Sequence, residues 1–152
     1  MAIALPGGGR AAHSGWPATP YGCSAMAARR ILVIEDEPGA REALESLLSE
    51  EGYAVTSAES GETGLRQLTE FHPDTVVCDF YLPDTDGLQL LRRVRSEAEV
   101  TFIVITAGCG GDGVERTLQR EADYFFQKPV DLKRLRHVLQ RDARPPALAR
   151  RA

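Results

Sequence analysis

Five short apolar segments alternate with five longer segments of mixed polarity between residues 29 and 142. The short segments are rich in β-branched and aromatic residues, which is typical of buried strands. The longer segments carry apolar residues at helical spacing and are bounded by Pro or Gly, which is typical of amphipathic helices. Strands are predicted at residues 31–34, 53–57, 75–78, 102–105 and 124–126, and helices at residues 38–51, 60–71, 88–95, 114–121 and 131–141.

Strict alternation of strand and helix predicts a parallel sheet that is covered by helices on both faces. Five such units are too few for a closed eight-stranded barrel. We therefore expect an α/β fold with an open, doubly wound, five-stranded parallel sheet of the flavodoxin-like class. The strand at 53–57 is more polar than the others, which indicates a place at the edge of the sheet.

The two ends of the chain lack this pattern. Residues 1–28 are rich in Gly, Ala and Pro without periodicity and are expected to form a disordered leader, with Met26 as an alternative start. Residues 143–152 contain mainly Pro, Ala and Arg and are expected to form a flexible basic tail. The domain itself is expected at residues 29–142.

The composition favours a cytoplasmic protein. No apolar run approaches the roughly 18 residues of a membrane span, and the first residues lack a secretory signal, so we expect no membrane association. Three cysteines, Cys23, Cys78 and Cys109, are few and lack metal-ligand spacing, as expected of reduced thiols.

Charge is distributed unevenly along the chain, whose net charge is −4. Residues 35–131 contain 21 acidic residues but only 8 Lys or Arg. Such an acidic segment does not suit a nucleic-acid-binding surface, so we expect no nucleic-acid partner. It suits a site that gathers carboxylates around a cation.

Chemically active side chains follow four of the predicted strands, whose carboxyl ends meet at one edge of the sheet. Glu35 and Asp36 follow the first strand, and Asp79, Thr106 and Lys128 follow the third, fourth and fifth. Crowded carboxylates repel one another unless a cation lies among them, and Mg²⁺ takes one or two carboxylates. A carboxylate beside such an ion can attack phosphorus, while an ammonium and a hydroxyl stabilise the phosphoryl oxygens.

Each of these residues also has an ordinary structural interpretation. Asp79 and Thr106 could simply cap the turns that follow them, and Lys128 could be a surface residue. Cys78 is interpreted as a small buried apolar residue. The residues alone leave these alternatives open.

Four motifs in order resemble the response-regulator receiver domain of two-component signalling. They are ILVIEDEP, VVCDFYLPDTDG, FIVITAG and DYFFQKP, and they cover the chain from Ile31 to Arg141 together with the helices between them. Asp36 and Asp79 are 43 positions apart, Asp79 and Thr106 are 27 apart, and Thr106 and Lys128 are 22 apart, as in this family. Each motif alone is weak, but the four in order are specific.

The resemblance implies a role for each matching residue. Asp79 would accept the phosphoryl group from a histidine kinase or a histidine phosphotransfer protein. Mg²⁺, or Mn²⁺ as a substitute, would be bound by Asp36, by Asp79 and by the backbone carbonyl of Tyr81, with Glu35 in the outer sphere.

The remaining roles concern the response to phosphorylation. Thr106 and Lys128 would contact the phosphoryl oxygens, and Thr106 and Phe125 would form the conformational switch. The Lys128–Pro129 peptide bond would be cis, as in the family.

The sequence departs from the family pattern in three places. Glu35 replaces the more common Asp, which lengthens the acid by one methylene. Phe125 lacks the hydroxyl of Tyr, so a switch there depends on packing. The glycines between Gly108 and Gly113 predict a loosely held fourth helix and put in doubt a dimerisation face built from the fourth and fifth helices.

We therefore predict a receiver module without an output domain of its own, which is switched by phosphorylation and signals through contacts with a target protein that the sequence does not identify. It would not be an enzyme beyond its own phosphorylation and dephosphorylation at Asp79. One alternative is a pseudo-receiver that binds partners without phosphorylation. Another is a Mg²⁺-dependent phosphohydrolase with an aspartyl-phosphate intermediate, although Tyr81 stands where such enzymes commonly need a second acid.

Overall fold

A computed structural model describes residues 28–108 and 111–142. The predicted tail, all but the last residue of the predicted leader, and two of the three cysteines lie outside the described residues. The strands are β1 (Arg30–Ile34), β2 (Ala54–Ala58), β3 (Thr75–Asp79), β4 (Thr101–Thr106) and β5 (Tyr124–Gln127). The helices are α1 (Pro38–Glu50), α2 (Gly61–Phe71), α3 (Gly87–Glu97), α4 (Asp112–Glu121) and α5 (Leu132–Arg141).

All five strands are parallel and form one sheet in the order β2-β1-β3-β4-β5, which confirms the predicted architecture. The polar strand β2 lies at an edge, as expected. In the register of the two central strands, Ile34 of β1 pairs with Cys78 of β3. Glu35, the residue after Ile34, therefore lies beside Asp79.

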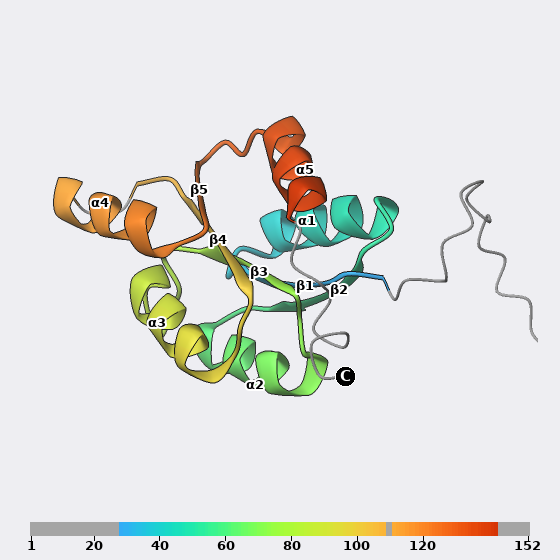
Figure 1. The fold of residues 1–152 in the computed structure, drawn as a ribbon, viewed down its shortest axis with the longest axis horizontal. Coiled ribbons are helices and arrows are strands. Elements are labelled where there is room, and N and C mark those ends of the chain that lie inside the picture. Colours follow the sequence, from blue (N-terminus) through green and yellow to red (C-terminus); the bar gives the residue numbers. More distant parts are fainter. Residues whose placement is uncertain (1–27, 109–110, 143–152) are drawn as a thin grey trace, which may run out of the picture.

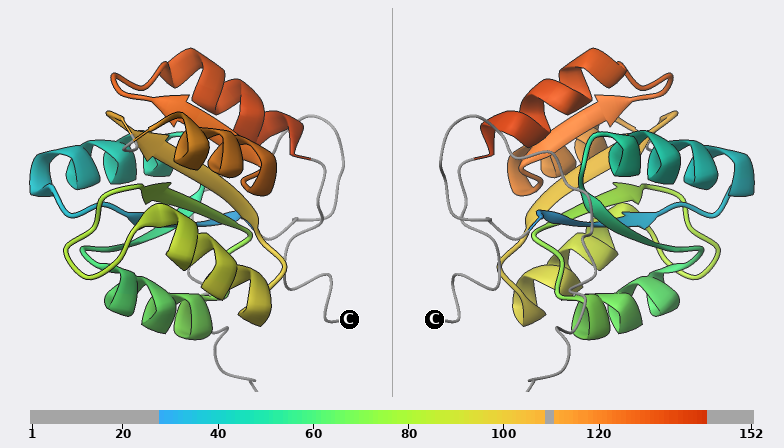
Figure 2. Two further views of the ribbon diagram at one scale, coloured as in Figure 1. Left: turned by 90° about the vertical axis from the view of Figure 1, so that its left-hand side faces the viewer. Right: turned by 90° about the vertical axis from the view of Figure 1, so that its right-hand side faces the viewer.

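Helices cover both faces of the sheet. Figure 1 shows α1 and α5 on one side and α2 and α3 on the other, and the two side views in Figure 2 show the same layers. Side chains alternate along each strand, so the apolar core has two halves. Leu118 of α4 belongs to the half under α2 and α3, and Leu135 of α5 belongs to the half under α1. Among the described residues, no helix combines the length and apolar composition that crossing a membrane requires.

Polar side chains cap the starts of α2, α3 and α5. Ser60 and the N3 residue Thr63 form a reciprocal capping box at the start of α2. Asp86 and Asp131 accept hydrogen bonds from the first N–H groups of α3 and α5. At the end of α1, Gly52 adopts a φ of 94°, which residues with a Cβ rarely adopt.

Carboxylates hold the amino ends of the strands. Asp74, before β3, accepts a 2.8 Å bond from the backbone N–H of Arg30 in β1. Asp123, before β5, accepts a 2.8 Å bond from the N–H of Phe102 in β4. Backbone N–H groups outside the regular strand-to-strand hydrogen bonds would otherwise lack a partner. These two acids therefore stabilise the amino ends of the strands, which lie opposite the predicted site.

Candidate functional site

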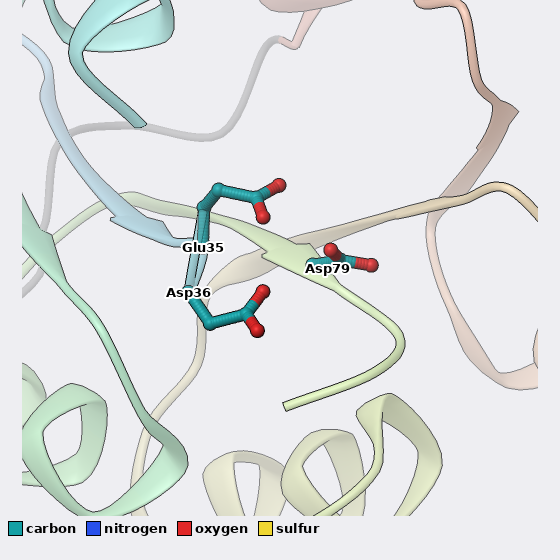
Figure 3. Close-up of side chains that lie close together, drawn as sticks. All are labelled: Glu35, Asp36 and Asp79. Atoms are coloured by element: carbon teal, nitrogen blue, oxygen red, sulfur yellow. The ribbon is translucent and has the colours of Figure 1, made fainter. Parts of the chain in front are cut away.

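Three carboxylates converge where β1 and β3 end. Glu35 and Asp36 directly follow β1, and Asp79 is the last residue of β3. One carboxylate oxygen from each of the three lies within 4.8 Å of the others, and Figure 3 shows the side chains gathered at this point. Glu35 and Asp79 are only 2% and 8% exposed, whereas Asp36 faces solvent. The sheet therefore brings together the acids that the sequence predicted.

Lys128 enters the same cluster from the end of β5. Its Nζ lies 2.9 Å from Oδ2 of Asp79 and 3.2 Å from Oε2 of Glu35. Burial disfavours the ammonium ion, but its hydrogen bonds with Asp79 and Glu35 outweigh burial and raise the pKa of Lys128. The side chain thus stays charged and neutralises part of the carboxylate cluster.

Glu35 has a strongly perturbed acidity. Burial of its carboxyl, together with the negative charge of Asp79, raises its pKa to about 6, although bonds from the N–H of Glu37 and from Lys128 oppose the rise. Glu35 therefore takes up a proton at a pH where ordinary carboxyls are ionised. Its Oε2 atom lies 3.2 Å from Nζ of Lys128.

Thr106 ends β4 and is fully buried, but its hydroxyl bonds within its own loop. It donates to the carbonyl of Gly108 at 2.8 Å and accepts from the N–H of Gly108 at 3.1 Å. Its backbone carbonyl accepts a 2.8 Å bond from the N–H of Lys128. The fold thus places Thr106 next to the cluster through its backbone, while its hydroxyl has the turn-capping contacts of the ordinary interpretation.

Tyr81 and Phe125 differ in burial. Tyr81 is 52% exposed, and its N–H donates a long 3.3 Å bond to Oδ1 of Asp79. Phe125 is half-buried and packs against the core under α2, α3 and α4, while Phe126 is buried in the other half. The Lys128–Pro129 peptide bond is cis.

Glu37 and Arg41 hold the loop between β1 and α1. The carboxylate of Glu37 accepts bonds from the N–H groups of Gly39 and Ala40, which caps α1. Arg41 donates to the carbonyls of Glu35 at 2.8 Å and Asp36 at 3.4 Å. Sequence reasoning missed both contacts; an acid just before Pro38 could have indicated the cap, but Arg41 gave no local signal.

Cys78 belongs to the core half under α2 and α3 and directly precedes Asp79. It is fully buried, and burial raises the pKa of its thiol well above the ordinary value, with the charges of Asp79 and Glu35 adding to the rise. The thiol therefore stays neutral, as the interpretation of Cys78 as a small apolar residue implies.

The donor set suits a hard divalent cation. It consists of carboxylate oxygens, with one acid exposed and two buried, and the ammonium group of Lys128 leaves the cluster with an excess of negative charge. Mg²⁺ prefers oxygen ligands, takes few carboxylates and keeps several waters, so an open, partly exposed cluster fits it. A phosphoryl group could approach Asp79 from the same side.

The family model described as "Response regulator receiver domain" matches residues 31–140. The chain belongs to this family. It is a receiver domain of the kind found in response regulators of two-component signalling, with the CheY-like fold.

Two of the similar curated proteins are transcriptional regulatory proteins. AfsQ1 of Streptomyces coelicolor is 39% identical over 118 residues, which are 75% of this chain and 52% of that protein. CseB of the same organism is 36% identical over 115 residues, which are 73% of this chain and 49% of that protein. The chain therefore spans about half the length of these relatives.

Solved receiver domains have the same fold. TrrA of Thermotoga maritima, determined in complex with Mg²⁺-BeF, is 31% identical with a TM-score of 0.65, and the match covers 74% of this chain and 96% of that one. A CheY-like receiver domain from Methylobacillus flagellatus is 28% identical with a TM-score of 0.64, over 75% of this chain and 98% of that one.

The comparisons give no support to the expectation that nucleic acid plays no part. That expectation came from the acidic middle segment, which describes the receiver domain alone. Because relatives such as AfsQ1 and CseB are transcriptional regulators about twice as long as the matched region, charge in this region does not exclude nucleic acid for the larger proteins.

Proposed function

We propose that the chain accepts a phosphoryl group on Asp79 from a histidine kinase or a histidine phosphotransfer protein and signals through contacts with a target protein. The observation that supports this most directly is the pairing of Asp79 with Lys128 at 2.9 Å inside a cluster of three carboxylates. An anionic nucleophile needs nearby positive charge before an anionic phosphoryl group can approach it. Lys128 supplies part of that charge.

In the proposed site, Asp36, Asp79 and the backbone carbonyl of Tyr81 hold Mg²⁺, and Glu35 acts through water. When bound, the ion neutralises charge on the phosphoryl oxygens. A carboxylate oxygen of Asp79 attacks the phosphorus atom, the bond from phosphorus to the donor histidine nitrogen breaks, and that nitrogen keeps the electron pair. The product is an acyl phosphate on Asp79 and a neutral histidine on the donor.

Two residues then carry the change outward. The ammonium group of Lys128, which is bonded to Asp79, then bonds to the phosphoryl oxygens. Thr106 exchanges its bond to the Gly108 carbonyl for a bond to a phosphoryl oxygen, and Phe125 moves into the space beside it. The loop between β4 and α4 is thereby released from Thr106, which changes the surface that a target protein meets.

Intact-mass spectrometry after incubation with acetyl phosphate tests the proposal. The expected result is one adduct of about 80 Da that requires Mg²⁺ and is missing in Asp79→Asn. An adduct that persists in Asp79→Asn would show a different acceptor. Mg²⁺ binding without any adduct, and without binding of beryllofluoride, would instead favour the pseudo-receiver alternative.

A further inference from the structure

A single carboxylate joins the loop after Asp79 to the start of α2. Oδ1 of Asp84 accepts a 2.8 Å bond from the N–H of Gly61, and Oδ2 accepts a 2.8 Å bond from the N–H of Glu62. These two N–H groups are among the donors that a helix leaves unpaired at its start. Residues 22 and 23 positions apart are thus held by two short, charge-assisted bonds.

The helix does not depend on Asp84 for its own cap. The hydroxyl of Ser60 accepts the bond from the N–H of Thr63, and the Thr63 side chain bonds back to the N–H of Ser60. Asp84 therefore caps the remaining donors of α2 from outside the helix. Its bonds join two parts of the fold, whereas those of Ser60 stay within one.

Backbone hydrogen bonds cross the loop that carries Asp84. The N–H of Gly87 donates to the carbonyl of Phe80 at 2.7 Å, Leu82 donates to Thr85 at 3.2 Å, and Tyr81 pairs with Asp86 in an isolated antiparallel bridge. Asp84 lies at the tip of this structure and Tyr81 at its base. A displacement of Asp84 should therefore also displace the backbone of Tyr81 through these bonds.

The start of α2, which Asp84 contacts, is connected through β2 to the acidic cluster. The end of β2, just before Ser60, accepts a 3.0 Å bond at the Ala58 carbonyl from the N–H of Glu35. A continuous path therefore runs from Glu35 through β2 and the start of α2 to Asp84, and from there to Tyr81 and Asp79. Within this path, Asp84 provides the hydrogen bonds that join α2 to the loop after Asp79.

We propose that Asp84 is a positioning residue, which clamps the loop after Asp79 against α2 and thereby holds the Tyr81 carbonyl where Mg²⁺ binds. This inference rests on the proposed function. Asp84 itself does not touch the metal site. Groups that orient metal ligands commonly contribute tenfold or more to metal affinity.

Gly61 offers a second way to open the clamp. A Cβ added at Gly61 would lie 2.4 Å from Cγ2 of Thr85 and 3.2 Å from Oδ1 of Asp84. Gly61→Ala would therefore push the loop away from α2, while alanine is itself a better helix former than glycine. Thr85→Ala in the same chain would remove the methyl group at 2.4 Å. Only the 3.2 Å approach to Oδ1 of Asp84 then remains, which a shift of a few tenths of an ångström relieves, so the clamp should be recovered.

The test compares Mg²⁺ affinity in Asp84→Ala and Gly61→Ala with that in Ser60→Ala, a matched control that weakens the same helix end but leaves the clamp in place. Isothermal titration without a phosphodonor gives the affinity, and the Mg²⁺ dependence of phosphorylation by acetyl phosphate gives the half-saturating concentration and the rate at saturation. We expect Asp84→Ala and Gly61→Ala to bind Mg²⁺ about tenfold more weakly with the saturated rate retained. Ser60→Ala should bind like the wild type, and Gly61→Ala combined with Thr85→Ala should recover.

Wild-type affinity in Asp84→Ala, or an equal loss in Ser60→Ala, would overturn the positioning role. If the wild type itself binds no Mg²⁺ and takes no phosphoryl group, the proposed function fails, and the positioning role fails with it. Should Asp84→Ala fold poorly by circular dichroism, Gly61→Ala and its rescue by Thr85→Ala decide the question alone.

Discussion

Replacing Glu35 by Gln should make the stability of the metal-free protein less sensitive to pH. The pKa of Glu35 is about 6 in the folded protein, whereas an unperturbed glutamate, as in the unfolded chain, has a pKa of 4.5. At pH 7.5 the carboxyl is ionised in both states, so the raised pKa disfavours folding by about 2 kcal/mol. As the pH falls through 6, the folded state takes up the proton first, so this penalty begins to shrink, and it is gone below pH 4.5.

The expected magnitude follows from the same two pKa values. Between pH 7.5 and pH 5.0, the free energy of unfolding of the wild type should rise by about 1 kcal/mol relative to that of Glu35→Gln. Urea denaturation of both proteins in the presence of EDTA measures this difference. A pH titration that follows the chemical shift of the Glu35 side-chain carboxyl carbon by NMR measures the pKa directly.

Glu37→Gln is a suitable control because the neighbouring acid is shifted in the opposite direction. Bonds from the N–H groups of Ala40 and Gly39 lower the pKa of Glu37, so this carboxyl titrates below the chosen pH range. The pH dependence of Glu37→Gln should therefore run parallel to that of the wild type. Parallel curves for Glu35→Gln as well would refute the raised pKa and the buried, charge-crowded environment from which it follows.

Three further substitutions test other parts of the structure. Lys128→Ala removes the ammonium group that competes with Mg²⁺ for the carboxylates, so calorimetry should show Mg²⁺ binding retained or strengthened. Hydrogen exchange in the β4–α4 loop should no longer respond to phosphorylation. Equal loss of Mg²⁺ binding and of this response would contradict the role of Lys128. Leu118→Ala empties a fully buried position, and urea denaturation should show a loss of about 2–5 kcal/mol. Gly113→Ala adds a Cβ that meets nothing within 4 Å in the first turn of α4, so thermal denaturation should show a gain of up to about 1 kcal/mol.

The regular part of the fold could be predicted from local sequence. The end residues of the strands and helices differ by no more than two positions from the prediction, because apolar runs, Pro38 and capping residues such as Ser60 act over a few residues. The acidic cluster could also be predicted, since strand order alone brings Glu35, Asp36 and Asp79 to one edge.

Contacts between distant segments could not be predicted in this way. The Pro, Asp and Gly residues around Asp84 indicate only a turn, and the bonds of Asp84 to α2 depend on how the loop is oriented in space. Likewise, nothing in the local sequence tells whether the Thr106 hydroxyl faces the cluster or Gly108. Such choices depend on rotamers and loop geometry that only the assembled fold determines.

The sheet also acts as a partition. Since strands β1, β3 and β4 are buried on both faces, they separate the core half that contains Leu118 from the half that contains Leu135. Substitutions on opposite sides share no packing partner, and their effects on stability should therefore add, whereas neighbours within one half should couple. The side chains of one core half could therefore be redesigned without disturbing the packing of the other half, because only the sheet is shared between them.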